Sequence, residues 1–377
     1  MQKGCKKCFL SCSLTSGANV IYCRKIHDGF QIILSVKRIT IKEIARKAGV
    51  SVGTVDRVLH NRGEVAEKTK KRVLKIAEEG NYSTNVFARN LKLNKTYNLA
   101  IILPDDNEYW RTQKLGVKRA TKELQDLGVQ STFYSFDRKN CGSFISQSEA
   151  AIKQKPDGVV MAPLMGKESP KVCQRLNEYD IPFVFVDSNI IEADPLTFVG
   201  QDTFQSGYLA AKLLNIGESA GLHTGVIIYS DYDSQNKTLR ERIHGYRQYY
   251  KDKGWADHLV EEFIVESSDF YDTNQLLEIK SLFIPNSRAH QVWEHLGDQR
   301  IQDYRVLGYD QIQPNVDALE SGAVDFILNQ NPQLQGYLSV QSLYKKLILN
   351  APVESVYYMP IEVITKENLQ YANVAYW

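Results

Sequence analysis

The chain has 377 residues, of which 43% are hydrophobic and 24% charged, and its formal net charge is +2. This composition is too apolar for a mostly disordered chain, and the length favours more than one domain. No stretch of about 18 consecutive apolar residues occurs, which excludes a transmembrane helix. The near-neutral total hides an uneven distribution, since residues 1–35 carry +4, residues 36–95 carry +9 and residues 96–377 carry −11. A basic segment on an acidic body is typical of a nucleic-acid-binding module joined to a second domain, although a solvated basic helix face would give the same charge.

Residues 1–35 hold four of the six cysteines, at Cys5, Cys8, Cys12 and Cys23. Four thiolates can hold zinc, but no second Cys-x-x-Cys pair is present. A signal peptide is another interpretation, although the apolar run after the lysines is interrupted within a few residues. We favour a third interpretation, a disordered tail or a misassigned start, in which a GTG codon at Val36 is read as the initiating methionine.

Residues 36–83 predict a small all-helical domain. Thr40 and Glu43 form a capping box for a first helix, and Gly49 supplies the turn that ends it. Ser51 caps a second short helix, so that the two helices form a helix-turn-helix. The apolar stripe expected on this second helix consists of Val52, Val55, Val58 and Leu59.

A third helix is expected from Glu67 to Glu79. Its apolar positions, Val73, Ile76 and Ala77, face inward. The opposite face carries cations suited to phosphate contacts, which set affinity rather than sequence preference. These cations are Lys68, Lys70, Lys71, Arg72 and Lys75.

The order of residues in this domain closely resembles the headpiece of the LacI/GalR repressor family. The matching runs are Ile41-Lys42-Glu43-Ile44-Ala45, Ala48-Gly49-Val50-Ser51, Thr54-Val55-Asp56-Arg57-Val58-Leu59 and Val65-Ala66-Glu67-Lys68-Thr69. The resemblance implies that the helix beginning at Val52 lies in the major groove, where Val52 can touch a thymine methyl and Arg57 can pair with guanine O6 and N7. The alternative for Arg57 is a solvent-facing cation.

Two residues depart from the family pattern. Gly53 occupies a base-reading position without a side chain, and Asp56 replaces the usual serine with a negative charge that should weaken DNA binding. The DNA contacts implied for the headpiece are Thr40, Ser51, Val52, Gly53, Thr54, Arg57, Asn61, Lys68 and Thr69.

Residues 84–96 resemble the family's hinge helix, which becomes ordered on operator DNA. The resemblance implies that Leu91 wedges between base steps of the minor groove while Arg89 and Lys92 contact the groove or the backbone. The alternative is an ordinary linker whose leucine packs on the body. Ser83 and Thr84 stand where the family usually has a proline, so the start of the hinge is less rigid.

Residues 97–377 alternate apolar strands with helical segments. The strands are expected at 99–103, 158–161, 183–186, 198–199, 225–228, 282–284, 305–308 and 326–328. Repeated strand–helix units predict an α/β core of parallel sheets with helices on both faces, and this length suits two lobes. The arrangement resembles the family's core, which is shared with periplasmic sugar-binding proteins.

Polar and aromatic residues follow these strands, where ligands bind in such folds. Tyr109 and Trp110 can stack on the C–H face of a sugar, and the charged and amide groups can bond its hydroxyls. Structural alternatives are a helix N-cap for Asp202 or Asp310 and a core aromatic for Trp110. The predicted ligand-binding residues are Asn107, Tyr109, Trp110, Asp187, Asp202, Arg242, Asn286, Asp310 and Gln330.

These observations predict a cytoplasmic, homodimeric transcription regulator, of repressor type, that does not associate with a membrane. Its partners are operator DNA and a small effector, which is a sugar in preference to a nucleobase; whether the effector induces or corepresses stays open. Cys141 and Cys173 lie far apart in a body that is typical of a reduced compartment.

No enzymatic function is predicted, because Walker A, GxSxG, HExxH and strand-following GxGxxG motifs are absent. The seven histidines show no metal-ligand spacing, so no metal and no cofactor is expected. Two other functions stay open. A transport-associated solute receptor would require an export signal, and a carbohydrate-active enzyme would require a nucleophile or a pair of acids.

Overall fold

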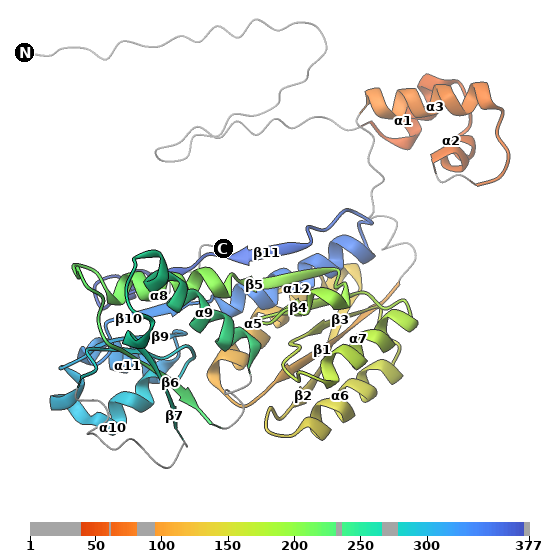
Figure 1. Ribbon diagram of the computed structural model, residues 1–377. Helices are drawn as coiled ribbons and strands as arrows, with labels where there is room; N and C mark the ends of the chain where they lie inside the picture. The colour runs from red at the N-terminus through yellow and green to blue at the C-terminus, as the bar shows by residue number, and fades with distance from the viewer. Residues whose placement is uncertain (1–38, 60–61, 81–94, 231–235, 266–277, 373–377) are drawn as a thin grey trace, which may run out of the picture. The chain divides into compact units, whose positions relative to one another are not determined.

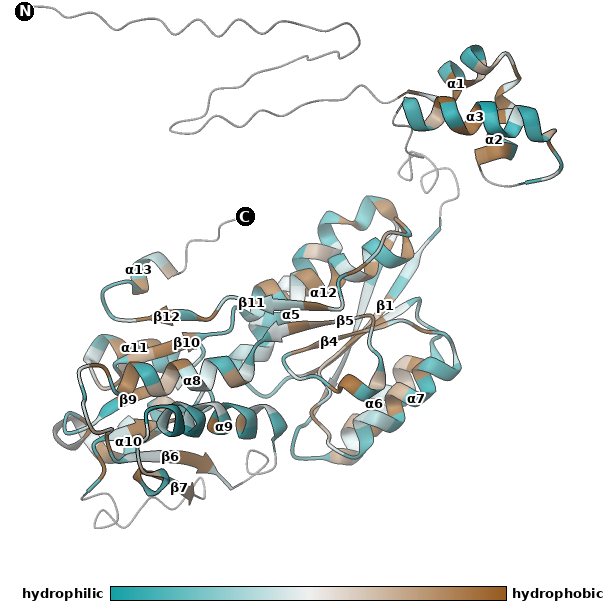
Figure 2. Cartoon of the chain, turned by 45° about the horizontal axis from the view of Figure 1, so that its top comes forward, coloured by the Kyte–Doolittle hydropathy of each residue, from teal (hydrophilic) through white to brown (hydrophobic). Residues whose placement is uncertain are grey.

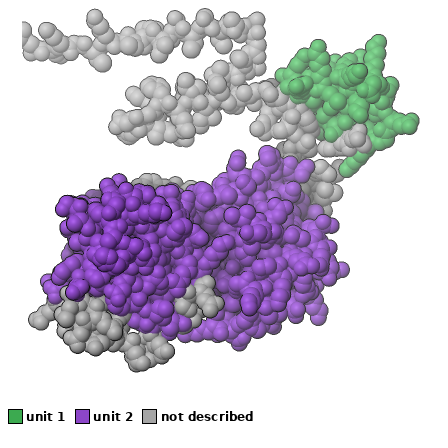
Figure 3. Space-filling view, viewed as in Figure 1, with its two compact units in different colours: residues 1–85 green, residues 86–377 purple. Residues whose placement is uncertain are grey.

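The computed structural model describes residues 39–59, 62–80, 95–230, 236–265 and 278–372 (Figure 1). The chain divides into two compact units, residues 1–85 and 86–377, which are coloured separately in Figure 3. In the described ranges, none of the helices combines the length and the apolar character needed to cross a bilayer.

The described part of the first unit contains three helices, α1 (Ile41–Ala48), α2 (Val52–Leu59) and α3 (Glu67–Glu79). The capping box at the start of α1 is confirmed, because the Thr40 hydroxyl accepts from the Glu43 backbone amide while the Glu43 carboxylate accepts from the Thr40 backbone amide. Gly49 ends α1 in the left-handed conformation with φ of 63°, which a residue with a Cβ adopts less readily. Ile44, Val55 and Val73 are fully buried, one from each helix, and form the centre of the core of this unit.

The second unit consists of two lobes, each built on a six-stranded sheet. The first lobe has the strand order β11-β5-β4-β3-β1-β2, with all pairs parallel. The second has the order β12-β10-β9-β8-β6-β7, in which only β12 runs antiparallel to its neighbour. The α/β, two-lobed prediction is therefore confirmed.

The elements of the first lobe are β1 (Tyr97–Pro104), α5 (Glu108–Glu123), β2 (Val129–Phe136), α6 (Cys141–Lys153), β3 (Gly158–Met161), α7 (Glu168–Glu178), β4 (Phe183–Val186), β5 (Thr197–Gln201), α12 (Pro332–Leu347) and β11 (Val356–Met359). Those of the second lobe are α8 (Thr203–Leu214), β6 (Thr224–Tyr229), α9 (Lys237–Asp252), β7 (Val260–Val265), β8 (Ser281–Phe283), α10 (Ala289–Ile301), β9 (Arg305–Tyr309), α11 (Gln313–Ser321), β10 (Phe326–Asn329), β12 (Glu362–Ile364) and α13 (Leu369–Ala372).

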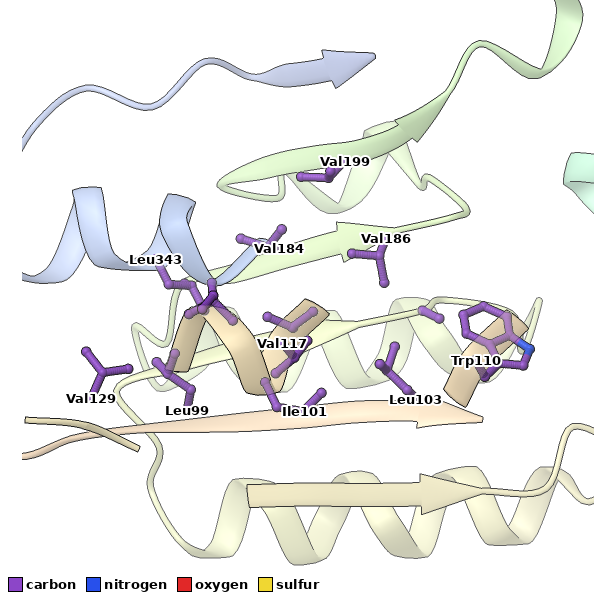
Figure 4. Packing of buried hydrophobic residues seen from close by; sticks show 14 of the residues in the cluster. Leu99, Ile101, Leu103, Trp110, Val117, Val129, Val184, Val186, Val199 and Leu343 are labelled. Carbon is purple, nitrogen blue, oxygen red and sulfur yellow. The ribbon is translucent and has the colours of Figure 1, made fainter. Parts of the chain in front are cut away.

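Alternation along the strands places helices on both faces of each sheet. From β1, Leu99, Ile101 and Leu103 pack toward α5 and α12 (Figure 4), whereas Ala100 and Ile102 pack toward α6 and α7. Strands covered on both faces are mostly apolar, and β4 is accordingly brown in Figure 2, while the visible side of α9 is mostly teal.

The chain passes between the lobes three times. It crosses after β5 to α8, after β10 to α12, and from β11 to β12, so that the two sheets share three connecting segments. We call these segments the first, second and third crossovers; they include Gln201 and Asp202, Asn329 to Asn331, and Pro360 and Ile361, respectively. All three lie side by side, since Gln201 on the first crossover bonds carbonyls of the second and the third.

Candidate functional site

The predicted ligand-binding side chains converge on one cavity between the lobes, which we call the cleft. Its lining includes eight of the nine predicted residues: Asn107, Tyr109, Trp110, Asp187, Arg242, Asn286, Asp310 and Gln330. The carboxyl ends of β1, β4, β8, β9 and β10 bring most of them there, as expected for parallel sheets.

Asp202 does not line the cleft. Its side chain accepts a hydrogen bond from the Gln205 backbone amide at 2.9 Å and caps α8, which is the structural alternative considered for this residue. The first residue after a strand can serve the cleft or the following helix, and the sequence alone does not distinguish these two roles.

The first lobe contributes an aromatic pair and a buried acid. The Tyr109 hydroxyl donates to Asp187 Oδ1 at 2.8 Å, and the rings of Tyr109 and Trp110 meet edge to face with centroids 4.9 Å apart. Figure 4 shows Trp110 at the carboxyl end of β1, with its ring nitrogen turned away from the apolar cluster. This Nε1 is buried and has no hydrogen-bond partner among the described residues, so it is a donor available to a ligand.

The second lobe contributes a buried guanidinium and a second acid. Arg242, only 4% exposed, donates to the Pro285 carbonyl at 2.8 Å and to Gln330 Oε1 at 2.6 Å, and it stacks 3.9 Å from the centre of the Tyr309 ring. Gln330 Nε2 in turn donates to Asp310 Oδ1 at 2.8 Å. Arg242 Nε has no partner among the described residues and is a second available donor.

Burial shifts the ionisation of both acids. Desolvation raises the pKa of Asp310 from 3.8 to about 7, against the opposing effects of Arg242 and of the hydrogen bond from Gln330. Desolvation also raises the pKa of Asp187, again opposed by Arg242 and by the Tyr109 hydroxyl. Carboxyl groups with raised pKa values inside a cleft are typical of binding sites.

Both acids also have strained backbones. Asp187 and Asp310 have φ values of 66° and 68°, in the left-handed region that few residues other than glycine adopt. Such conformations persist where the surrounding structure enforces them, and they gather at ligand sites. The two strained acids occupy equivalent places, since Asp187 follows β4 and Asp310 follows β9.

The cleft offers both donors and acceptors at short range. Its carboxylates accept hydrogen bonds, while Trp110 Nε1 and Arg242 Nε donate them. A hydroxyl group satisfies both types at once, so a polyhydroxylated ligand matches this arrangement.

Seven further residues line the cleft that sequence reasoning did not select: Arg138, Leu164, Asn236, Thr238, Leu239, Pro285 and Ser287. Arg138 follows β2, a strand whose mixed polar and apolar residues give no strand signal in the sequence. Arg138 donates to Asp106 Oδ2 at 2.6 Å and lies 5.9 Å from the Trp110 ring. Asn236 caps α9, and its N-cap position ahead of a helix was the signal that could have identified it.

The cleft is narrow in this structure. Its volume is about 60 Å³, whereas pockets that hold small ligands typically measure roughly 300–1,000 Å³. A larger hollow of about 700 Å³ lies beside the crossovers and shares Tyr109 and Asp310 with the cleft. A ligand of ordinary size therefore does not fit the cleft as it stands in this structure.

The helical domain exposes most of its predicted DNA-contacting residues. Val52 is 47% exposed, so its expected place in the apolar stripe of α2 is wrong, whereas Val55 and Val58 are buried. Arg57 is exposed, and its Nε donates to the Gly53 carbonyl at 3.3 Å. Gly53 and Lys68 are also exposed.

Two predicted contacts also serve as helix caps. Thr40 caps α1, and the Ser51 hydroxyl accepts from the Thr54 backbone amide at 3.1 Å and lies 2.9 Å from the Thr54 hydroxyl. Thr69 is partly buried in α3. The remaining predicted contacts, Asn61, Arg89, Leu91 and Lys92, lie outside the described residues, as do the four N-terminal cysteines.

Among the residues that the structure describes, no group of three or more His, Cys, Asp or Glu side chains could hold a metal ion. Cys141 is exposed and Cys173 buried, and both are free thiols.

Two family descriptions match the chain. The periplasmic binding protein domain matches residues 99–350, and the description "Bacterial regulatory proteins, lacI family" matches residues 40–85. The crystal structure of a putative LacI transcriptional regulator from Bacteroides fragilis is 31% identical, with a TM-score of 0.66, over 74% of this chain and 99% of that one. The chain belongs to the LacI family of bacterial regulatory proteins.

Two relatives support the same assignment for this LacI-family chain. The HTH-type transcriptional regulator MalR of Streptococcus pneumoniae is 24% identical over 84% of this chain and 99% of its own length. The HTH-type transcriptional regulator DegA of Bacillus subtilis is 29% identical over 57% of this chain, and the match covers 61% of DegA. The chain is a DNA-binding transcription regulator with a periplasmic-binding-protein-like ligand-binding domain, which favours the regulator over the solute-receptor alternative.

Proposed function

We propose that this regulator is a repressor whose operator affinity is controlled by a neutral sugar bound in the cleft. The carrying observation is the convergence of Asp187, Asp310 and Arg242 from two lobes onto one cavity that also contains two unpartnered buried donors. Two guanidinium groups, those of Arg138 and Arg242, line the cleft together with Asp187 and Asp310, so the cationic and acidic groups balance and uncharged hydroxyl groups are accommodated.

A thermal-shift screen tests the sugar proposal. A ligand that binds only the folded state stabilises it, by about 2.7 kcal/mol at a concentration one hundred times its Kd. The panel contains neutral pentoses, hexoses, disaccharides and inositol, with their phosphorylated and acidic counterparts, and nucleobases. Asp310→Asn is the matched variant, and a neutral sugar that stabilises the parent should stabilise it less. A nucleobase as the sole hit would overturn the sugar proposal and make the regulator nucleobase-responsive.

The proposed reading of DNA rests on Arg57 in α2. Its exposed guanidinium is flexible enough to leave the Gly53 carbonyl and pair with a guanine, at a gain in discrimination of about 1–3 kcal/mol. Gly53 leaves this helix with one fewer side chain for base contacts. The cations of α3, among them the exposed Lys71 and Arg72, are proposed to contact phosphates.

Binding to the DNA upstream of the protein's own gene tests this assignment. Arg57→Ala should relax base preference at one position of each half-site, which competition with mutated operators measures. Arg72→Ala is the control, because removing a cation that binds phosphate weakens the affinity for all DNA sequences equally and reduces its salt dependence. Unchanged sequence preference in Arg57→Ala would contradict the proposed role of this residue.

The regulator is further proposed to act without catalysis in the cytoplasm, where operator DNA is found, and as a homodimer. Two headpieces would then contact two half-sites of a pseudo-palindromic operator. Sedimentation at micromolar concentration checks this state, and a monomer that still binds operator DNA would contradict it. Loss of a sugar hit through chemical turnover would instead indicate an enzyme.

A further inference from the structure

A single buried side chain connects all three crossovers. Gln201 is the last residue of β5, on the first crossover, and is 2% exposed. Its Nε2 donates to the carbonyl of Asn329 on the second crossover at 3.2 Å and to the carbonyl of Pro360 on the third at 3.3 Å. Both amide hydrogens are thus used on the two other crossovers.

The second crossover carries the contact directly to the cleft. Asn329 is held by Gln201, while its neighbour Gln330 accepts from Arg242 and donates to Asp310 inside the cleft. The Gln330 carbonyl accepts from Gln335 at 2.9 Å, and Gln335 Oε1 accepts from the Asp187 backbone amide at 3.2 Å. The Asn329 carbonyl that Gln201 bonds thus belongs to the peptide group that leads directly to Gln330, whose side chain bonds Arg242 and Asp310 in the cleft.

Two hydrogen bonds join the described parts of the lobes at points away from the crossovers. The Ser188 and Thr238 hydroxyl oxygens lie 2.6 Å apart across the cleft, and the Gln313 backbone amide donates to Glu108 Oε2 at 2.9 Å. Such bonds contribute little net free energy, because each group bonds water when the lobes part. Contacts of this strength leave the balance between open and closed lobes sensitive to the crossovers themselves.

Rotation of the lobes must turn the peptide planes of the crossovers, since these segments absorb the change in φ and ψ. In this structure, where the cleft is narrow, the Asn329 and Pro360 carbonyls both accept from Gln201 Nε2. Turning either plane lengthens or breaks its bond to Gln201, so these two bonds favour the closed lobes over the open ones.

We propose that Gln201 is a positioning residue that favours closure of the lobes by joining the three crossovers. Its regulatory meaning rests on the proposed function, because an effector in the cleft would act on the same equilibrium. The effect of Gln201 on the position of the lobes does not require any effector or DNA. The role of Gln201 in closure can therefore be tested separately from the proposed function.

The closed state can be trapped chemically in the full chain. Ser188→Cys and Thr238→Cys place two thiols where two hydroxyls lie 2.6 Å apart, within reach of a disulfide when the lobes are closed. The rate at which this bond forms under mild oxidation reports the closed population, and mass spectrometry of the linked 188–238 peptide distinguishes it from bonds of the native cysteines. Adding Gln201→Met, which keeps the size but removes the amide, should slow bond formation at least threefold.

Asn215→Leu is the matched control. Asn215 is buried and its side chain bonds Ala211, Leu222 and Tyr250 within the second lobe, away from the crossovers. This variant should lower the melting temperature without changing the rate of disulfide formation. If Gln201→Met proves poorly folded by circular dichroism, Gln201→Glu takes its place, since an ionised carboxylate cannot donate to two carbonyls. Equal rates in the parent, the Gln201 variant and the control would overturn the proposal, whereas a slowed rate in the Gln201 variant alone would support it.

Discussion

The two lobes share a backbone arrangement at the cleft but differ in the side chains that surround it. Each presents a buried acid with positive φ at the end of a strand, Asp187 in the first lobe and Asp310 in the second. The partners differ, because Asp187 is bonded by the Tyr109 hydroxyl, whereas Asp310 lies among Gln330 and the Arg242 guanidinium. The first lobe thus provides the Tyr109 and Trp110 rings, the second provides the Arg242 guanidinium, and each lobe provides one acid.

The same likeness extends to the helices behind each acid. In the first lobe, α5 and α12 meet at Gly116 and Gly336; in the second, α8 and α9 meet at Gly207 and Gly245. A Cβ on any of the four would overlap a backbone carbonyl of the facing helix. These close helix contacts fix Arg242 on α9 and Tyr109 on α5, and so they position the cleft from behind.

The largest expected effect on stability comes from removing the buried positive charge of Arg242 in the second lobe. Arg242→Met should lower the free energy of unfolding by about 3–5 kcal/mol near pH 8, because it leaves buried acids without their compensating cation. At pH 5 the loss should be smaller, since the protonated Asp310 carboxyl needs no such partner. Urea unfolding at both pH values measures it. Arg175→Met, at an exposed pair with Glu149, is the control and should change little.

The helix contacts provide the next test of the likeness between lobes. Gly116→Ala and Gly207→Ala should each destabilise the protein by about 2–3 kcal/mol, because the added methyl forces two helices apart. Gly166→Ala, where a Cβ would meet nothing within 4 Å, should stay within about 0.5 kcal/mol of the parent. Tolerance of alanine in one lobe only would show that the two helix pairs are not equivalent.

The pKa of Asp310 predicts a pH dependence. Because the folded-state pKa of about 7 lies above the ordinary 3.8, the folded protein binds this proton more tightly than the unfolded chain. The resulting stability is fully present at low pH and is lost as the pH rises through about 7. Asp310→Asn removes the titration, so the change in unfolding free energy between pH 5 and 8 should shrink by about 2–3 kcal/mol. An unaltered pH profile would contradict the raised pKa.

The smallest effect on stability is expected from removing the Tyr109 hydroxyl in the first lobe. Tyr109→Phe removes the hydrogen bond to Asp187 and should cost about 1 kcal/mol. Its control is Tyr337→Phe, which removes an exposed bond to Glu123. A larger loss from Tyr337→Phe would show that the buried bond contributes no more than a surface one, and thermal unfolding of both variants compares them.

The pattern of correct and missed strands has one physical cause. Every strand expected from the sequence lies inside a sheet, and each of the four strands that were missed, β2, β7, β11 and β12, forms a sheet edge. Interior strands are covered on both faces and consist of continuous apolar runs. Edge strands are half exposed and mix polar with apolar residues, as the Val129–Phe136 strand does, so they lack that signal.

The sequence alone determined the local features of this protein. The capping box of Thr40 and Glu43, the turn at Gly49 and the apolar runs of the interior strands depend on neighbours within a few residues, and so they could be inferred without a structure. The rule that ligands meet the carboxyl ends of parallel strands was enough to select Asp187 and Asp310. Tertiary structure decided what depends on residues far apart in the chain. It assigned Asp202 to a helix cap, brought Arg138 beside Trp110, and placed the Gln201 amide between carbonyls 128 and 159 residues away, contacts that no local pattern encodes.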